Sequence, residues 1–251
     1  MSGREQLHDW FSGIPGRLIV EAEVGLLDQA LPNLFGFHLV QVGGLGDADL
    51  MSKSRILNRV VVSLAGDRDE TRYPVVRGTA TALPVESDSV DVVLLPHILE
   101  FESQPHEALR ESARVLVPEG HVVICGFNPW SMLGCWKYLA GRNRAMPWGG
   151  HFLRPTRLRD WLALLGFDVL LQQVCFFKPP FTNEQLLRKL DVLDQAGARL
   201  LPYFGGAYIL LARKRLTTLT PIRTRWRPKR RLVSVGLVGP AARVADRERS
   251  R

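Results

Sequence analysis

Apolar and helix-like segments alternate along the first half of the chain. The short, nearly continuous apolar runs lie at residues 39–42, 59–64, 73–78, 90–95 and 121–127. Apolar residues at helical spacing fill 49–58 and 104–116 between them. Buried strands separated by helices are typical of a parallel sheet with both faces covered. The pattern therefore predicts an α/β fold.

The last elements follow a different order. A helix is expected at 156–165, a strand at 167–177, a second helix at 183–199 and a strand at 206–215. Two strands that flank one long connection predict an antiparallel pair at the edge of the sheet. Residues 10–35 read as an amphipathic helix, which either closes a ligand cleft or packs on the sheet.

Length and composition favour one soluble domain with appendages. The 251 residues are 46% hydrophobic, enough for a full core. The three cysteines form no C-x-x-C pair, so we expect neither a zinc site nor a disulfide framework, and a reducing compartment. The first residues lack the apolar core of a signal peptide, and the longest apolar run is too short to span a bilayer. We expect a cytoplasmic protein.

The net charge of +8 is unevenly distributed. Residues 213–251 hold 13 Lys and Arg against two Asp and Glu, which leaves the preceding part at −3. This tail has little to bury, so we expect it to be disordered. Such tails contact nucleic acid or anionic lipid through phosphate charge, or act only as solubilising extensions.

The stretch LVQVGGLGDADLM, residues 39–51, joins an apolar run to three glycines and then to two aspartates. Glycines give the backbone the freedom that a tight turn or a close ligand approach requires. Asp47 or Asp49 is placed to cap a following helix. In open parallel sheets the ligand lies beyond the carboxyl ends of the strands, so this turn is the first candidate site.

Two long segments resemble class I S-adenosylmethionine-dependent methyltransferases. Residues 78–101, GTATALPVESDSVDVVLLPHILEF, are similar to the family's middle motifs, G-D-A-x-x-L-P-F-x-D-x-S-F-D-V-V and a histidine-containing segment. Residues 108–129, ALRESARVLVPEGHVVICGFNP, resemble its helix, V-L-x-P-G-G turn and fifth strand. Residues 158–170 and 208–215 resemble its closing helix and strand.

The resemblance covers about residues 35–215 and implies a Rossmann-like, seven-stranded sheet, mostly parallel with an antiparallel edge, with helices on both faces. In FGFHLVQVG, VICGFNPWSMLG and the basic tail, the chain resembles an uncharacterised bacterial group of methyltransferase-like proteins. The expected organisation is a helical segment at 1–35, a methyltransferase domain at 36–215 with a lid-like insertion at 129–155, and a tail at 216–251.

The resemblance implies S-adenosylmethionine as cofactor. It assigns the cofactor contacts to Gly43, Gly44, Gly46, Thr79, Ala80, Leu83 and Pro96. The family's first loop reads acidic-x-Gly-x-Gly-x-Gly, and only Gly43 stands in register, although Gly44 and Gly46 can serve the same purpose after a one-residue shift. Gln41 replaces the carboxylate, while Leu45 and Asp47 occupy the other two glycine positions.

Two further acidic positions of the family are also changed. The carboxylate that usually ends the second strand falls near Ser63 and Leu64, with Asp67 a few residues late, and Thr79 replaces the adenine-binding aspartate. A dinucleotide is the alternative ligand, since Gly44-x-Gly46 begins a G-x-G-x-x-G motif. Asp49 ends that motif where pyrophosphate would sit, which disfavours NAD.

Methyl transfer requires alignment of the acceptor and sometimes one base, because the sulfonium is already a strong electrophile. His97, in LLPHILEF, stands where the family's loop passes the methionine end, so it is the candidate base. A histidine there also serves as a packing or hydrogen-bonding residue. Glu100 reads as structural, and His151 is a second candidate base.

The most distinctive extra material is residues 126–155, too long for an ordinary connection and expected to cover the site as a lid. Its Trp130 and Trp148 offer flat apolar walls, and Arg154 offers a fork for an acidic group. We assign these three residues to the substrate; a small satellite core under the loop is the alternative.

The sequence thus predicts an S-adenosylmethionine-dependent methyltransferase acting on a small-molecule acceptor. The rival is a non-catalytic binding protein with a degenerate cofactor site, because Gln41, Leu45 and Thr79 depart from the motifs. A nucleic-acid methyltransferase is disfavoured, since no N-P-P-[YFW] motif follows the fourth strand. No metal ligand set is expected.

Overall fold

A computed structural model describes residues 3–67, 71–139, 150–178 and 204–216. The chain divides into two units, Met1–Thr217 and Thr218–Arg251, and all described residues lie in the first. The expected helix at 183–199, Trp148 and nearly all of the basic tail lie outside the described residues.

Seven strands form one sheet in the order β3-β2-β1-β4-β5-β7-β6. Strands β1 to β5 pair in parallel, while β7 pairs antiparallel with both β5 and β6. The mostly parallel sheet with an antiparallel edge is therefore confirmed. The strands are β1 His38–Val42, β2 Asn58–Ser63, β3 Val75–Arg77, β4 Val90–Pro96, β5 Leu116–Phe127, β6 Phe167–Cys175 and β7 Ala207–Lys214.

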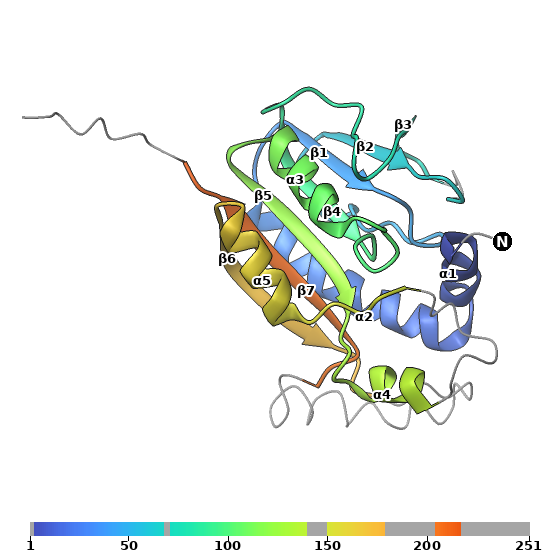
Figure 1. Cartoon of the computed structure of the whole chain (residues 1–251). Coiled ribbons are helices and arrows are strands. Elements are labelled where there is room, and N and C mark those ends of the chain that lie inside the picture. Colours follow the sequence, from blue (N-terminus) through green and yellow to red (C-terminus); the bar gives the residue numbers. More distant parts are fainter. Residues whose placement is uncertain (1–2, 68–70, 140–149, 179–203, 217–251) are drawn as a thin grey trace, which may run out of the picture. The chain divides into compact units, whose positions relative to one another are not determined.

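Helices cover both faces of the sheet (Figure 1). On one face, α1 (Gly3–Phe11) and α2 (Ile14–Ala30) pack against alternate strand residues such as Leu39. On the other face, α3 (Pro105–Val115) and α5 (Pro155–Leu164) pack against the intervening residues such as Val40. Alternate residues of a strand point to opposite faces, so continuous apolar strands supply two cores at once.

The helix expected at 10–35 is two helices. Ser12 and Gly13 separate α1 from α2, and Pro15 supplies the pre-set backbone angle at the start of α2. A Cβ on Gly16 would lie 2.4 Å from the carbonyl oxygen of Trp10, so this glycine lets the second helix fold back closely on the first. The fold-back brings α1 toward the carboxyl ends of the strands.

The helix expected at 49–58 is wrong, because this stretch forms turns. The guanidinium of Arg59 donates to the carbonyls of Ile56, Met51 and Ser54 at 2.7, 3.0 and 2.8 Å. Asp49 Oδ1 accepts from the Met51 amide at 3.1 Å, so this aspartate caps a turn rather than a helix. Side chains thus satisfy backbone groups that a helix would have paired.

A short helix, α4 (Met132–Leu139), follows β5 within the insertion. It lies near the end of the sheet toward which the β5 arrow points (Figure 1). Within the described part of the chain, no helix has the length and apolar character needed to cross a membrane.

Candidate functional site

The glycine turn leaves β1 at the carboxyl edge of the parallel strands. Gly43 has φ +76° and donates to the carbonyl of Val62 at 2.8 Å, while Gly46 has φ +55°. These left-handed angles are what glycine adopts without strain. Gln41, buried at the end of β1, donates through Nε2 to the Gly43 carbonyl at 2.9 Å. The neutral amide at the usual carboxylate position thus supports the turn itself.

Helix α1 lies over this turn and contributes two polar side chains to it. Arg4 Nε donates to Asp67 Oδ1 at 2.7 Å, and its Nη2 lies 3.4 Å from the Gly44 carbonyl oxygen. His8 Nε2 lies 3.1 Å from the same Asp67 oxygen, and its Nδ1 accepts from the Gly46 amide at 3.1 Å. Both Arg4 and His8 are buried.

Asp67 is the anion at the centre of these contacts. Its Oδ2 accepts from the amides of Leu64 at 2.9 Å and Gly44 at 3.2 Å. Burial alone would raise the pKa of this carboxyl, but the hydrogen bond from His8 and the charge of Arg4 hold the pKa below its usual value. Asp67 therefore stays ionised and joins α1, the glycine turn and the end of β2.

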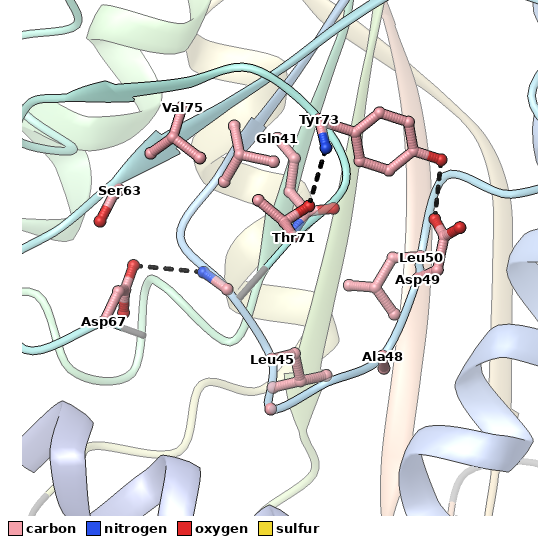
Figure 2. A pocket seen from close by; sticks show the side chains of 13 residues that line it. Gln41, Leu45, Ala48, Asp49, Leu50, Ser63, Asp67, Thr71, Tyr73 and Val75 are labelled. Carbon is pink, nitrogen blue, oxygen red and sulfur yellow. Dashed lines mark hydrogen bonds between the residues drawn. The ribbon is translucent and has the colours of Figure 1, made fainter. Parts of the chain in front are cut away.

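Figure 2 shows the cavity beside this turn, with Asp67 on one side and the hydrogen-bonded pair Tyr73 and Asp49 on the other. Its volume is about 20 Å³, room for one water molecule, whereas cofactor pockets hold roughly 300–1,000 Å³. Gln41, Ser63 and Val75 contribute to its wall. The cavity as described is thus too small for a nucleoside.

One donor beside this turn is not used. Within the described residues, Arg4 Nη1 is buried and has no hydrogen-bond partner. A Cβ on Gly43 would approach Arg4 Nη2 to 2.5 Å and Ile98 Cδ1 to 2.7 Å, so the guanidinium lies directly against the glycine backbone. An unpaired guanidinium donor against a glycine turn suits a carboxylate or another small anion.

The remaining cofactor residues expected from the sequence follow neighbouring strands. Pro96 ends β4 and is buried. Thr79 follows β3, is exposed, and its hydroxyl lies 3.5 Å from the Ala82 carbonyl oxygen. Ala80 and Leu83 are buried in the core on the α3 side of the sheet. These residues share the carboxyl edge with the glycine turn, because β1 to β4 are parallel.

His97, the expected base, is fully buried between two carboxylates. Its Nε2 lies 2.9 Å from Glu23 Oε1 of α2, and its Nδ1 lies 3.4 Å from Glu100 Oε1. Burial by itself would lower the pKa of His97, but the charges and hydrogen bonds of Glu23 and Glu100 raise it to about 10. His97 is therefore an enclosed imidazolium at neutral pH, and in this state it cannot accept a proton.

Glu100 also binds backbone, since its Oε1 accepts from the Phe127 amide at 2.7 Å. Within the described residues, the second oxygens of Glu23 and Glu100 are buried without a hydrogen-bond partner. The structural reading of Glu100 agrees with these contacts. His151, the second candidate base, is exposed, and its backbone amide donates to the Glu100 carbonyl at 2.6 Å.

Two of the three expected substrate residues lie together. The Arg154 guanidinium stacks over the Trp130 ring at 4.7 Å, and both side chains are exposed. Arg154 lines an open hollow of about 450 Å³ with Pro129, Phe152, Leu153, Thr156, Arg157 and Asp160. Phe152 packs on Phe127 at 5.1 Å between ring centroids, and Phe127 on His97 at 4.0 Å. The rings of Phe152 and Phe127 thus lie between the hollow and the buried His97.

Three residues of the site were missed in the sequence: Arg4, His8 and Glu23. Each is a polar residue that lies among buried apolar residues of its helix, Arg4 and His8 on α1 and Glu23 on α2. Glu23 shares its face with Ile19, Val20 and Leu27, all buried. A charge at that position is the signal that was available, because a lone carboxylate on an apolar helix face requires a buried partner.

The chain is similar to known methyltransferases and, over most of its length, to a bacterial relative. A family model described as a methyltransferase domain matches residues 57–124. The uncharacterized protein YafS of Escherichia coli is 32% identical over 218 residues, which cover 84% of this chain and 83% of that protein. The ubiquinone/menaquinone biosynthesis C-methyltransferase UbiE of Roseobacter denitrificans is 27% identical over 128 residues, about half of each chain.

Solved structures share the fold at lower identity. A SAM-dependent methyltransferase of Thermotoga maritima, described as a possible histamine N-methyltransferase, superposes with a TM-score of 0.58 at 20% identity. The match covers 79% of this chain and 92% of that one. A SAM-dependent methyltransferase of Archaeoglobus fulgidus has a TM-score of 0.51 at 19% identity, covering 76% and 92%.

Proposed function

This chain belongs to the class I S-adenosylmethionine-dependent methyltransferase family, and we propose that it transfers a methyl group from S-adenosylmethionine to a small-molecule acceptor. The observation that carries the proposal is the unpaired Nη1 of Arg4, held against the glycine turn that follows β1. The family that the chain resembles uses the glycines of this loop for close approach to the cofactor, and Arg4 lies against that loop.

The residues present fit the cofactor in chemistry but not in volume. Arg4 provides a donor for the methionine carboxylate, and Gly43 lets the backbone approach closely. Thr79 replaces the usual aspartate with a neutral hydroxyl. The cavity of about 20 Å³ has to widen before a nucleoside enters. We infer that Arg4 exchanges part of its contact to Asp67 for the methionine carboxylate when the cofactor binds.

The bound sulfonium supplies an electrophilic methyl group, so the protein's task is orientation and exclusion of water. His97 holds its proton between Glu23 and Glu100, which fixes α2 to the end of β4. We therefore infer that His97 positions the site rather than removing a proton. An acceptor that requires deprotonation must lose its proton to another group or to solvent.

We place the acceptor in the hollow beside Trp130 and Arg154, whose wall includes Pro129 and Phe152 of the insertion. The stacked pair and the adjoining Phe152 favour a molecule with an aromatic or apolar body and an acidic group. The names of some relatives, such as demethylmenaquinone methyltransferase, refer to ring compounds. An acceptor with an aromatic body agrees with these names. The Phe152 and Phe127 rings separate the hollow from His97 and must shift if the acceptor passes between them.

A non-catalytic binding protein is the second candidate. The small cavity favours it, and so does Asp67, whose oxygens are already bonded to Arg4, His8 and two amides. A protein of this kind would bind cofactor or product without transferring the methyl group.

Isothermal titration of the full chain with S-adenosylmethionine and S-adenosylhomocysteine tests the proposal. We expect binding at micromolar to sub-millimolar strength. Arg4→Ala should weaken both ligands by about tenfold or more but leave 5′-methylthioadenosine, which lacks the amino-acid end, unchanged. Arg17→Ala, an exposed arginine of α2, is the matched control.

Absence of heat and of any thermal shift at millimolar ligand would reject cofactor binding. Binding without transfer of labelled methyl to any member of a metabolite library would favour the second candidate. Equal losses for methylthioadenosine and S-adenosylmethionine in Arg4→Ala would mean that Arg4 only holds α1 in place.

A further inference from the structure

Helix α4 exposes an apolar face at the carboxyl edge of the sheet. The α4 face consists of Trp130, just before the helix, and Met132, Cys135 and Trp136 within it. Trp130 and Met132 are each 54% exposed, Trp136 is 44% exposed, and Cys135 is also exposed. Residues three and four apart share one side of a helix, so the three helical members form one stripe.

The opposite side of α4 is fixed to the domain. Leu133 is buried, and Ser131 Oγ caps the helix by accepting from the Gly134 amide at 3.0 Å. Ser131 Oγ also donates to the Asn128 carbonyl at 2.7 Å, and Asn128 Nδ2 donates to the Gly205 carbonyl at 3.0 Å. These contacts fix how α4 is turned about its own axis, so its apolar face points away from the domain.

Positive charge lies around this face. Arg154 stacks on Trp130, with its guanidinium 4.7 Å from the ring centroid. Arg157 lines the same hollow as Arg154, where Asp160 is the acidic neighbour.

Exposed tryptophans and a methionine beside arginines match the interface of an anionic bilayer. Tryptophan prefers the headgroup level, where its ring is half apolar and half wet. An amphipathic helix with such a face lies in the plane of the interface, and anionic lipid attracts the flanking cations. A folded protein partner would be equally apolar, but the surrounding cations and the short helix favour a charged lipid surface.

We propose that the α4 face docks the protein on anionic membranes. Met132 and Trp136 enter the interface while Arg154 and Arg157 contact lipid phosphates. Docking in this orientation turns the hollow beside Trp130 toward the lipid surface. The proposal does not depend on methyl transfer.

Vesicle flotation of the full chain tests the docking. The vesicles contain two parts phosphatidylcholine to one part phosphatidylglycerol, with pure phosphatidylcholine as comparison. We expect binding to the anionic vesicles, weakened about tenfold by Met132→Asp or Trp136→Asp. Leu164→Asp, at an 86% exposed position of α5, should bind like wild type. Thermal melts of all variants confirm that each is folded.

Truncation after residue 217 separates the tail from the helix. We expect the truncated chain to lose the salt-sensitive part of binding and to keep the difference between wild type and Trp136→Asp. The proposal would be overturned if vesicle binding is lost on truncation of the tail and is unchanged by the α4 substitutions. A lipid-free dimer that Trp136→Asp dissociates would also overturn it, because the face would then bind a second copy.

Discussion

Arg4 and Asp67 form a buried ion pair across 63 positions of the chain, with Nε 2.7 Å from Oδ1. The pair fastens the first helix to the end of β2, directly over the glycine turn. Asp67 therefore organises four neighbours at once: Arg4, His8 and the amides of Leu64 and Gly44.

Asp67→Asn should destabilise the fold by about 1–3 kcal/mol, because buried donors lose a charged acceptor. The folded pKa of Asp67 lies below the unfolded value of 3.8, so its contribution is present above pH 3.8 and is lost as pH falls through the folded pKa. Urea unfolding at several pH values measures this, and the gap between wild type and variant should shrink in acid. Asp47→Asn, exposed in the same turn, is the control; an equal loss there would contradict the assignment.

Three glycine substitutions separate backbone strain from crowding. Gly43→Ala meets Arg4 and Ile98 and carries φ +76°, whereas Gly166→Ala has φ +81° with nothing within 4 Å. Gly25→Ala, within α2, has neither problem. We expect Gly25→Ala to stabilise by up to about 1 kcal/mol, Gly166→Ala to cost about 1 kcal/mol, and Gly43→Ala to cost more than Gly166→Ala.

Chemical denaturation ranks the three glycine variants. If Gly43→Ala costs no more than Gly166→Ala, then Arg4 is not packed against the turn. Cofactor titration of the folded Gly43→Ala protein should show weaker binding than wild type, because the added methyl group occupies the side of the turn that faces Arg4.

His97→Gln should cost roughly 3–5 kcal/mol, since it leaves Glu23 and Glu100 buried without their cation. Adding Glu23→Gln to His97→Gln should recover part of this loss, because it removes one of the two uncompensated charges. A double variant that is less stable than His97→Gln would contradict the ion-pair account. Equilibrium unfolding of the two variants decides it.

The His97 cluster also predicts a pH dependence. Because the folded pKa of about 10 is raised above 6.5, the stabilisation is complete below pH 6.5 and is lost as pH rises through 10. Wild type should therefore lose stability relative to His97→Gln between these values. If methyl transfer is observed, its rate should show no ionisation of His97 near neutrality; a bell-shaped profile abolished by His97→Gln would restore the base role.

Trp130→Ala and Arg154→Ala should leave cofactor affinity and stability nearly unchanged, within about 0.5 kcal/mol for stability, because both side chains are exposed. Transfer to the acceptor should weaken in each. Titration, thermal melts and a labelled-methyl assay measure the three quantities. A loss of stability of a few kcal/mol with unchanged turnover would instead make the stacked pair part of a small core.

The amino-acid sequence determined the strands and the class of fold. Apolar runs at 39–42, 59–64 and 90–95 specify buried strands on purely local grounds, and β1, β2 and β4 occupy them. The motif at 78–101 added the family resemblance. Local pattern failed at 49–58, where helical spacing is present but Arg59 binds the carbonyls of the turns.

Only the tertiary structure decided which charges meet. Glu23 and His97 are 74 positions apart, and Arg4 and Asp67 are 63 apart. Nothing local to either partner encodes such a distance, because it depends on how α1 and α2 fold back over the carboxyl ends of β1, β2 and β4. The two carboxylates that the fold places beside His97 then outweigh the effect of burial and raise its pKa, so the histidine becomes an enclosed cation. The spacing of apolar residues determined the strands, and the packing of the helices on the sheet determined which charged groups meet.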